Sequence, residues 1–226
     1  MKTFTYALLF FLLLFTACTA PHEKVSVDYT TYVNPFIGTD FTGNTYPGAQ
    51  APFGMVQLSP DNGLPGWDRI SGYFYPDSTI AGFSHTHLSG TGAGDLYDIS
   101  FMPVTLPYKE AEAPLGIHSR FSHDDESATA GYYQVLLKDY NINVELTATE
   151  RCGIQRYTFP EAQAAIFLNL KKAMNWDFTN DSRIEIVDSV TIQGYRFSDG
   201  WARDQHIYFR TRFSKPFTSV QIDTTA

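Results

Sequence analysis

The sequence predicts an all-β protein, built as an antiparallel β-sandwich. Two observations support this class: short segments rich in β-branched and aromatic residues recur from residue 99 onward, and no long window combines helical periodicity with helix caps. Many short strands at hairpin-like spacing, with almost no helix, are typical of a sandwich or a barrel rather than of an α/β enzyme core.

Nine segments are expected to form strands. The most regular is 142–149, where the apolar side chains of Ile142, Val144 and Leu146 alternate with polar ones, as in a strand with one buried face. Turn residues at 138–141, 159–161, 188–189 and 198–200 separate neighbouring segments. The expected strands are residues 99–106, 132–138, 142–149, 154–159, 165–170, 184–187, 190–197, 206–213 and 217–222.

The stretch before these strands has a different composition. Eleven of the 16 glycines lie between Gly38 and Gly94, and six of the 12 prolines lie between Pro35 and Pro76. We therefore expect turns and closely approaching backbone in this stretch. The chain stops at Ala226 directly after an alternating segment, and we expect it to be part of a longer protein.

The amino terminus resembles an export signal. Lys2 precedes an apolar run at residues 7–15 that is too short to span a bilayer comfortably, so we expect a signal peptide at 1–17. The following Thr16-Ala17-Cys18 resembles the cleavage box of bacterial lipoproteins, in which the cysteine is lipidated. The alternative is an ordinary signal peptide with an incidental cysteine.

Lipidation at Cys18 would make the mature chain an exported lipoprotein of the outer membrane or periplasm of a Gram-negative bacterium. We expect residues 18–31 to form a tether and residues 32–226 to form the folded domain. Cys152 would then have no partner thiol, and we expect it to be an inert core residue.

Charge and composition exclude some classes of partner. The formal net charge is −8 and 43% of the residues are apolar. Nucleic acids and anionic lipids recruit clusters of Lys and Arg, which this sequence lacks. The apolar content is sufficient for a buried core, so the chain is not a disordered segment.

Two neighbouring motifs have the composition of a sugar-binding surface. Trp67, Asp68 and Arg69 form the first, and His85, His87 and Ser89 belong to the second. A sugar ring stacks on an aromatic face, and its hydroxyls need several donors and acceptors, while glycines let the ligand approach the backbone. The alternative interpretation is that the aromatic residues are core and the glycines mark loops.

The same residue types also occur in metal sites and in acid–base pairs. His85 and His87 have the spacing of a metal-binding pair on a strand, but the next acid, Asp95, lies further on than a cupin-type site would require. We therefore expect neutral histidines bonded to hydroxyl or backbone groups. Carboxylates at Asp61, Asp68, Asp77, Asp95 and Asp98 could supply an acid and a base, but turn and capping roles are the more common use of such acids. Residues 123–126 are expected to be a solvated polar turn.

The sequence is similar to the amino-terminal domain of glycoside hydrolase family 92. The similarity covers residues from about 32 to the end, in several blocks that occur in the same order. These blocks are Tyr32-Val33-Asn34-Pro35-Phe36-Ile37-Gly38-Thr39, Tyr46-Pro47-Gly48-Ala49, residues 52–61, residues 83–92, Gly131-Tyr132-Tyr133 and residues 145–149.

The resemblance implies an exported α-mannosidase of the kind common in gut Bacteroidetes. Such enzymes place a β-sandwich, expected here to be a galactose mutarotase-like supersandwich, on a larger α/α barrel. They hydrolyse terminal α-mannosides of glycans with calcium and with inversion. The acid, the base and most calcium ligands come from the barrel, so the resemblance implies that no catalytic residue lies in this chain.

Within this resemblance, Trp67 corresponds to a tryptophan that the family presents to the sugar beside the scissile bond. His85, His87 and Ser89 correspond to loop residues near that pocket, whereas Trp176 and Trp201 are expected in the core or at an interdomain contact. Two functions remain open: the pocket wall of an α-mannosidase, inactive alone, and a free-standing surface lipoprotein that binds glycans.

Overall fold

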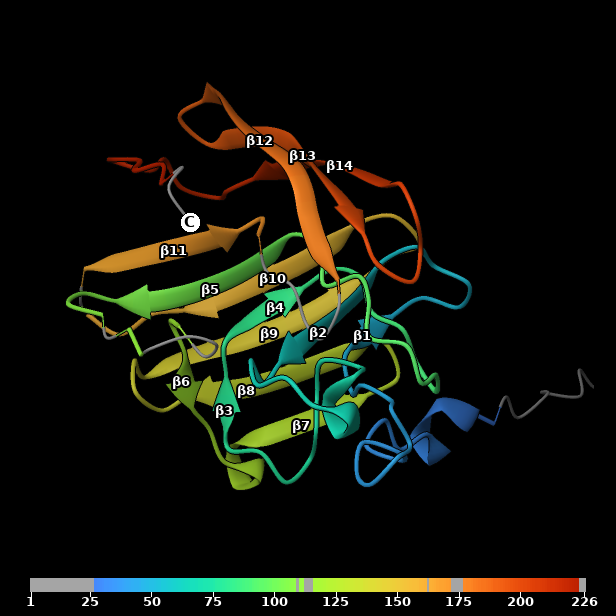
Figure 1. The fold of residues 1–226 in the computed structure, drawn as a ribbon. Coiled ribbons are helices and arrows are strands. Elements are labelled where there is room, and N and C mark those ends of the chain that lie inside the picture. The colour runs from blue at the N-terminus through green and yellow to red at the C-terminus, as the bar shows by residue number, and fades with distance from the viewer. Residues whose placement is uncertain (1–26, 109, 112–115, 162, 172–176, 224–226) are drawn as a thin grey trace, which may run out of the picture.

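The computed structural model describes residues 27–108, 110–111, 116–161, 163–171 and 177–223, so the expected signal peptide, Cys18 and Trp176 lie outside the described residues. Figure 1 shows the arrangement of the strands and of three short 3₁₀ helices. The strands are β1 (Ala49–Gln50), β2 (Gln57–Asp61), β3 (Thr79–Ile80), β4 (Gly82–Ser84), β5 (Ser100–Thr105), β6 (Ser119–Arg120), β7 (Glu126–Thr129), β8 (Tyr132–Leu137), β9 (Ile142–Ala148), β10 (Gly153–Thr158), β11 (Ala164–Asn169), β12 (Phe178–Asp188), β13 (Thr191–Asp199) and β14 (Gln205–Arg212), and the 3₁₀ helices are η1 (Tyr29–Tyr32), η2 (Trp67–Arg69) and η3 (His123–Asp125).

Two antiparallel sheets form the sandwich. One has the strand order β1-β2-β4-β5-β11 and the other has the order β10-β9-β8-β7. The main core lies between them, because buried side chains of β2, β4 and β5 pack in the same apolar cluster as those of β8 and β9. The predicted antiparallel β-sandwich is therefore confirmed.

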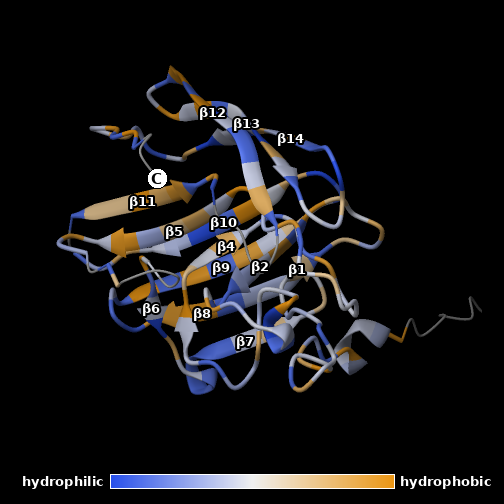
Figure 2. Ribbon diagram, in the orientation of Figure 1, coloured by the Kyte–Doolittle hydropathy of each residue, from blue (hydrophilic) through white to orange (hydrophobic). Residues whose placement is uncertain are grey.

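The alternation seen in the sequence decides which face of each strand is buried. In β8 the buried residues are Tyr133, Val135 and Leu137, and in β9 they are Ile142, Val144 and Leu146. Their neighbours in the sequence face away from the core, as the two-residue period of a strand requires. In Figure 2 the edge strand β7 is hydrophilic, whereas the neighbouring strands β8 and β9 carry hydrophobic segments.

A third antiparallel sheet, of order β12-β13-β14, packs against the other side of the five-stranded sheet. Apolar residues of β12 and β14, including Ile184, Ile207 and Phe209, contact a second core cluster around Ile99 and Phe101. In Figure 1 this sheet lies above β5 and β11. A short pair, β3 with β6, completes the described sheets.

The turn-rich first part of the chain also supplies central strands, which the sequence pattern did not reveal. β2 pairs with both β1 and β4, although it contains Pro60 opposite Phe83. Proline cannot donate a ladder hydrogen bond and normally argues against a central strand. The pairing with β4 covers only three residues, Ser59, Pro60 and Asp61, so the lost donor interrupts a short ladder.

Two expectations about individual segments are wrong, and of the two alternatives expected for Trp201 only the interdomain contact stays open. Residues 217–222 form no strand, because the Phe217 amide bonds to Ser189 O and the segment has no ladder partner among the described residues. Cys152 is exposed rather than buried, since it lies in the turn between β9 and β10, where its amide bonds to Thr149 Oγ1. Trp201 is not a core residue, because two thirds of it is exposed, at 66%.

The expected solvated turn at 123–126 is solvated only in part. The Glu126 side chain is buried and accepts hydrogen bonds from the hydroxyls of Tyr73 (2.9 Å) and Tyr133 (2.6 Å). His123 Nδ1 lies 2.7 Å from the same carboxylate, and the imidazole stacks on Tyr75. These contacts tie the loop after Trp67 to the β7–β8 edge of the second sheet.

None of the helices in the described part of the chain is both long and apolar enough to cross a membrane.

Candidate functional site

Trp67 begins η2 and points its indole into solvent. The side chain is 58% exposed, and the helix is preceded by Gly66 with φ +157°. One edge of the indole rests on Gly92, where an added Cβ would lie only 3.3 Å from Trp67 Cζ2. A bare glycine at that position thus lets the loop of residues 85–98 support the indole from below.

Arg69 fixes the turn that carries Trp67. Its Nε and Nη2 atoms donate to the two carboxylate oxygens of Asp77 at 2.6 and 2.5 Å, and its guanidinium lies 4.8 Å from the centre of the Phe74 ring. Hydrogen bonding to Asp77 raises the pKa of Arg69 above its usual range. Because Arg69 binds both carboxylate oxygens of Asp77, it holds the turn that carries Trp67 in one geometry.

Asp68 and Ser89 are the other predicted site residues close to solvent. Asp68 is half-buried in the middle of η2, and Ser89 is exposed on the loop of residues 85–98. That loop is tied down beside Ser89, where the Gly90 amide donates to Asn44 O at 2.6 Å. The structure therefore places Trp67, Asp68 and Ser89 on two neighbouring surface loops that meet at Gly92.

His87, in contrast, is a buried structural residue. Its Nδ1 lies 2.7 Å from Gln57 O, and its Nε2 lies 2.8 Å from Asp61 Oδ1 and 3.0 Å from Ser84 Oγ. Gly72 lies against this group, since a Cβ there would be 2.5 Å from Asp61 Oδ1. The side chains of His87 and Asp61 are fully buried, so neither can reach a ligand.

The contacts of His87 also exclude a catalytic Ser-His-Asp triad. A catalytic Ser-His-Asp triad needs the serine and the carboxylate on opposite ring nitrogens. Here Ser84 and Asp61 face the same nitrogen, and Gln57 O takes the other. The arrangement is a buried hydrogen-bond cluster that joins β2 to β4.

His85 lies between the two sheets. Its Nδ1 is 2.8 Å from Ile99 O, and its ring packs on Gly153, where an added Cβ would be 2.7 Å from His85 Cδ2. Burial lowers the pKa of His85, which favours the neutral imidazole. His85 and His87 thus bond to separate carbonyls, and the described residues contain no group of three His, Cys, Asp or Glu side chains suited to a metal ion.

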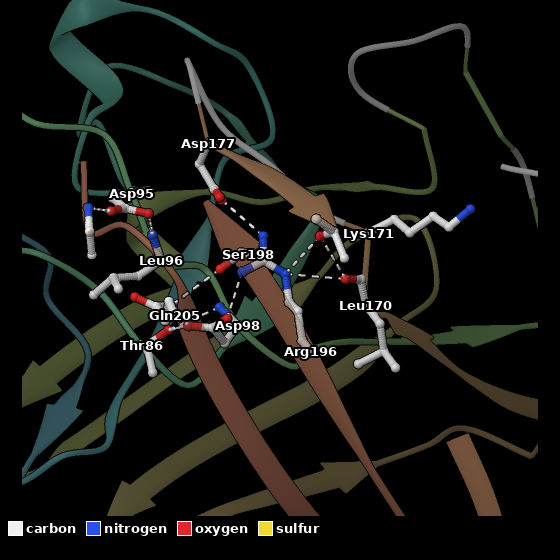
Figure 3. A network of polar contacts seen from close by, with 12 residues as sticks. Thr86, Asp95, Leu96, Asp98, Leu170, Lys171, Asp177, Arg196, Ser198 and Gln205 are labelled. Atoms are coloured by element: carbon white, nitrogen blue, oxygen red, sulfur yellow. Dashed lines mark hydrogen bonds and ion pairs between the residues drawn. The ribbon is translucent and has the colours of Figure 1, made fainter. Parts of the chain in front are cut away.

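Another candidate acid, Asp98, belongs to a buried polar network around Arg196 (Figure 3). Arg196 is fully buried; its Nη1 donates to Asp98 Oδ1 at 2.6 Å and its Nη2 donates to Asp177 Oδ2 at 2.9 Å. Asp98 also accepts hydrogen bonds from Thr86 and Gln205. Burial raises the pKa of Asp177 to about 6, although Arg196 opposes that shift.

Asp95 connects the loop of residues 85–98 to the tip of the β13–β14 hairpin. It is buried, and its carboxylate accepts the backbone amides of Leu96 (2.8 Å) and Ala202 (2.6 Å). Gly200 lies so close that a Cβ there would be 2.8 Å from Asp95 Oδ1. The bond to Ala202 holds the tip that presents Trp201 to solvent (Figure 3 shows Asp95 beside this network).

Comparison with known proteins connects this site to a family. Residues 32–225 match the model of the glycosyl hydrolase family 92 N-terminal domain. The chain belongs to that family. It is 44% identical, with a TM-score of 0.79, to the family GH92 alpha-mannosidase BT3965 from Bacteroides thetaiotaomicron, solved also in complex with mannoimidazole; the match covers 84% of this chain and 26% of that one.

Two further proteins are similar to this chain. The inverting mannosidase BT2199 from Bacteroides thetaiotaomicron is 29% identical with a TM-score of 0.69, over 87% of this chain and 26% of that one. An uncharacterized secreted glycosidase of Arthroderma benhamiae is 28% identical over 144 residues, which are 61% of this chain and 18% of that protein. This family 92 chain therefore spans about a quarter or less of the length of these relatives.

The family 92 assignment does not by itself say which residues contact a ligand. Of the six residues predicted for binding, Trp67, Asp68 and Ser89 stand at the surface, whereas Arg69 braces the turn and His85 and His87 face inward. The sequence predicts turn or capping roles for the acids Asp77 and Asp95 but does not identify their partners, and it does not single out Gly92. The signal for Gly92 is its glycine-rich surroundings, which indicate close approach.

Proposed function

We propose that this chain is the amino-terminal β-sandwich of an exported α-mannosidase and that Trp67 forms part of the wall of its mannose pocket. The observation that carries the proposal is the braced, solvent-facing indole. Exposing a tryptophan leaves its large apolar surface in water, and the Arg69–Asp77 fork and Gly92 hold it in that position. An aromatic face held in one orientation suits stacking on a sugar ring.

The proposal assigns hydrolysis to another part of the protein. A glycosidase needs two carboxyl groups on opposite sides of the scissile bond. Of the five candidate acids, Asp61, Asp77, Asp95 and Asp98 are bonded to His87, Arg69, backbone amides and Arg196 respectively, which leaves Asp68 without a second candidate acid to complete a pair. Acids engaged in this way also make a poor calcium site, so we expect most calcium ligands to come from another part of the complete enzyme.

Export and membrane attachment are a further part of the proposal. The apolar run at 7–15 and the Thr16-Ala17-Cys18 box support a lipid-anchored protein, and the similarity to a secreted glycosidase supports export. Radiolabelled fatty acid should be incorporated into the wild-type chain in a Gram-negative host and not into Cys18→Ser.

The first experiment compares the 226-residue chain with the product of the complete reading frame that contains it. We expect the complete product to release mannose from an α-mannobiose and the chain alone to release none. Mannose release by the chain alone would contradict the proposal. A reading frame that stops at Ala226, with glycan binding by that product, would favour the free-standing glycan-binding lipoprotein instead.

The second experiment tests Trp67 in the complete enzyme. We expect Trp67→Ala to lower kcat/KM for a disaccharide about thirtyfold, the size of loss found at aromatic contact residues, with little change in thermal stability. Trp67→Phe should retain part of the activity. Equal losses of stability and activity would show that the indole packs within the protein rather than on substrate.

A further inference from the structure

A second exposed tryptophan stands close to the Trp67 loop. Trp201 is 66% exposed at the tip of the β13–β14 hairpin, and the Gly200 amide closes the tip by donating to Ala202 O at 3.2 Å. The tip is fixed to the body of the protein by the buried Asp95, which accepts the Ala202 amide at 2.6 Å. The chain thus presents this indole from an anchored turn, as it does Trp67.

One short segment supports both indoles. Trp67 rests on Gly92, and the Trp201 tip is bonded to Asp95, three residues further along the same loop. Three residue steps of extended chain span at most about 11 Å. The two anchoring residues, Gly92 and Asp95, therefore lie within that distance of each other, and one aromatic turn is attached at each of them.

The surroundings of Trp201 are polar. Arg203 and Asp204 are exposed directly after it, and Asp204 Oδ1 lies 3.0 Å from His206 Nε2. Arg203 forms no hydrogen bond or ion pair among the described residues, so its five donors face solvent. An apolar ring face beside guanidinium and carboxylate groups matches a sugar, which offers apolar C–H faces together with hydroxyls.

We propose that Trp201 stacks on a second sugar residue of an α-mannose oligosaccharide, next to the residue that contacts Trp67. The inference rests on the proposed function, because it extends the same site along the glycan. It predicts that a trisaccharide engages both indoles, whereas a disaccharide engages only Trp67.

The test uses the 226-residue chain labelled with ¹⁵N. Its three tryptophans give three indole N–H signals, which the variants Trp67→Phe and Trp201→Phe assign. We expect α-mannobiose to shift the Trp67 signal alone and a linear α-mannotriose to shift both, with about tenfold tighter binding. Trp201→Ala should remove that tenfold gain and leave the affinity for mannobiose unchanged.

A matched control is Tyr208→Ala, which removes another exposed aromatic residue from the same hairpin. It should alter the affinity neither for α-mannobiose nor for α-mannotriose. A trisaccharide that shifts Trp67 but not Trp201 would overturn the inference and leave the proposed function standing. A failure of both glycans to shift either indole signal at about 10 mM would overturn the inference for this chain, whereas the proposed function is tested separately by mannose release and by Trp67→Ala in the complete product.

Discussion

Two arginine–carboxylate clusters in this molecule use the same chemistry in different surroundings. Arg196 is completely buried among Asp98 and Asp177, where it joins β13 to the segments before β5 and β12. Arg69 binds Asp77 at the surface, with 22% and 9% of the two side chains exposed. The buried cluster joins layers of the fold, while the surface pair fixes the direction of a single indole.

Burial decides how much stability depends on each cluster. Removing one partner of a buried ion pair leaves an uncompensated charge in a medium that solvates it poorly. A pair nearer the surface is partly screened by water, so its removal costs less stability. Loss of the first cluster should therefore unfold the protein more readily, and loss of the second should chiefly alter the order of Trp67.

The largest effect is expected for Arg196→Met. This change leaves Asp98 and Asp177 buried without their arginine, and we expect it to lower the free energy of unfolding by about 4 kcal/mol. Urea denaturation of the 226-residue chain measures the loss. Arg210→Met, on the exposed face of β14 in the same sheet, is the control and should cost less than about 0.5 kcal/mol. Equal losses would show that the buried cluster has no special role.

A smaller effect is expected from pH acting on Asp177. Burial raises its pKa to about 6 from an ordinary value of 3.8, so between these values the folded chain binds more protons than the unfolded chain. Stability due to this group is therefore present below pH 4 and is lost as the pH rises through 6, by about 3 kcal/mol at most.

The comparison variant for this titration is Asp177→Asn, whose amide oxygen can still accept from Arg196. The free energy of unfolding of Asp177→Asn minus that of the wild type should increase between pH 4 and pH 6. The increase should equal the stability that the wild type loses over that range. A constant difference between the two proteins across that range would contradict the assigned titration.

The smallest stability effect is expected for Asp77→Asn, at no more than about 1 kcal/mol, because the Arg69 fork is partly solvated. The indole of Trp67 should nevertheless become more mobile, which ¹⁵N relaxation of its N–H measures. Asp139→Asn disrupts a similar fork with Arg120 elsewhere on the surface and should leave Trp67 unchanged. An immobile Trp67 in Asp77→Asn would show that Arg69 does not brace the turn.

The fold was predictable wherever side-chain alternation was regular. The alternating residues of 142–149 became β9, with Ile142, Val144 and Leu146 in the core. Pairing between distant segments could not be read in the same way. β2 carries Pro60 and still pairs on both sides, whereas residues 217–222 have a strand-like composition and find no ladder partner among the described residues.

The site was predictable at the level of its surface motif and not at the level of individual roles. Composition pointed to the motif that contains Trp67, the resemblance to family 92 singled out that residue, and the structure exposes it. Arg69 and His87 belong to the same sequence motifs, but their functions depend on Asp77 and Asp61, which folding brings against them. Sequence spacing gives no information on such partners, so a polar residue that binds protein looks the same as one that binds ligand.

The central claim is that Trp67 contacts a mannoside. The most direct measurement is a crystal structure of the complete protein with an uncleaved α-mannoside in its pocket. We predict that carbon atoms of the Trp67 indole lie within about 4 Å of the sugar ring, with the Arg69–Asp77 fork intact. A bound mannoside remote from Trp67, with the indole instead packed against another part of the protein, would contradict the proposed function.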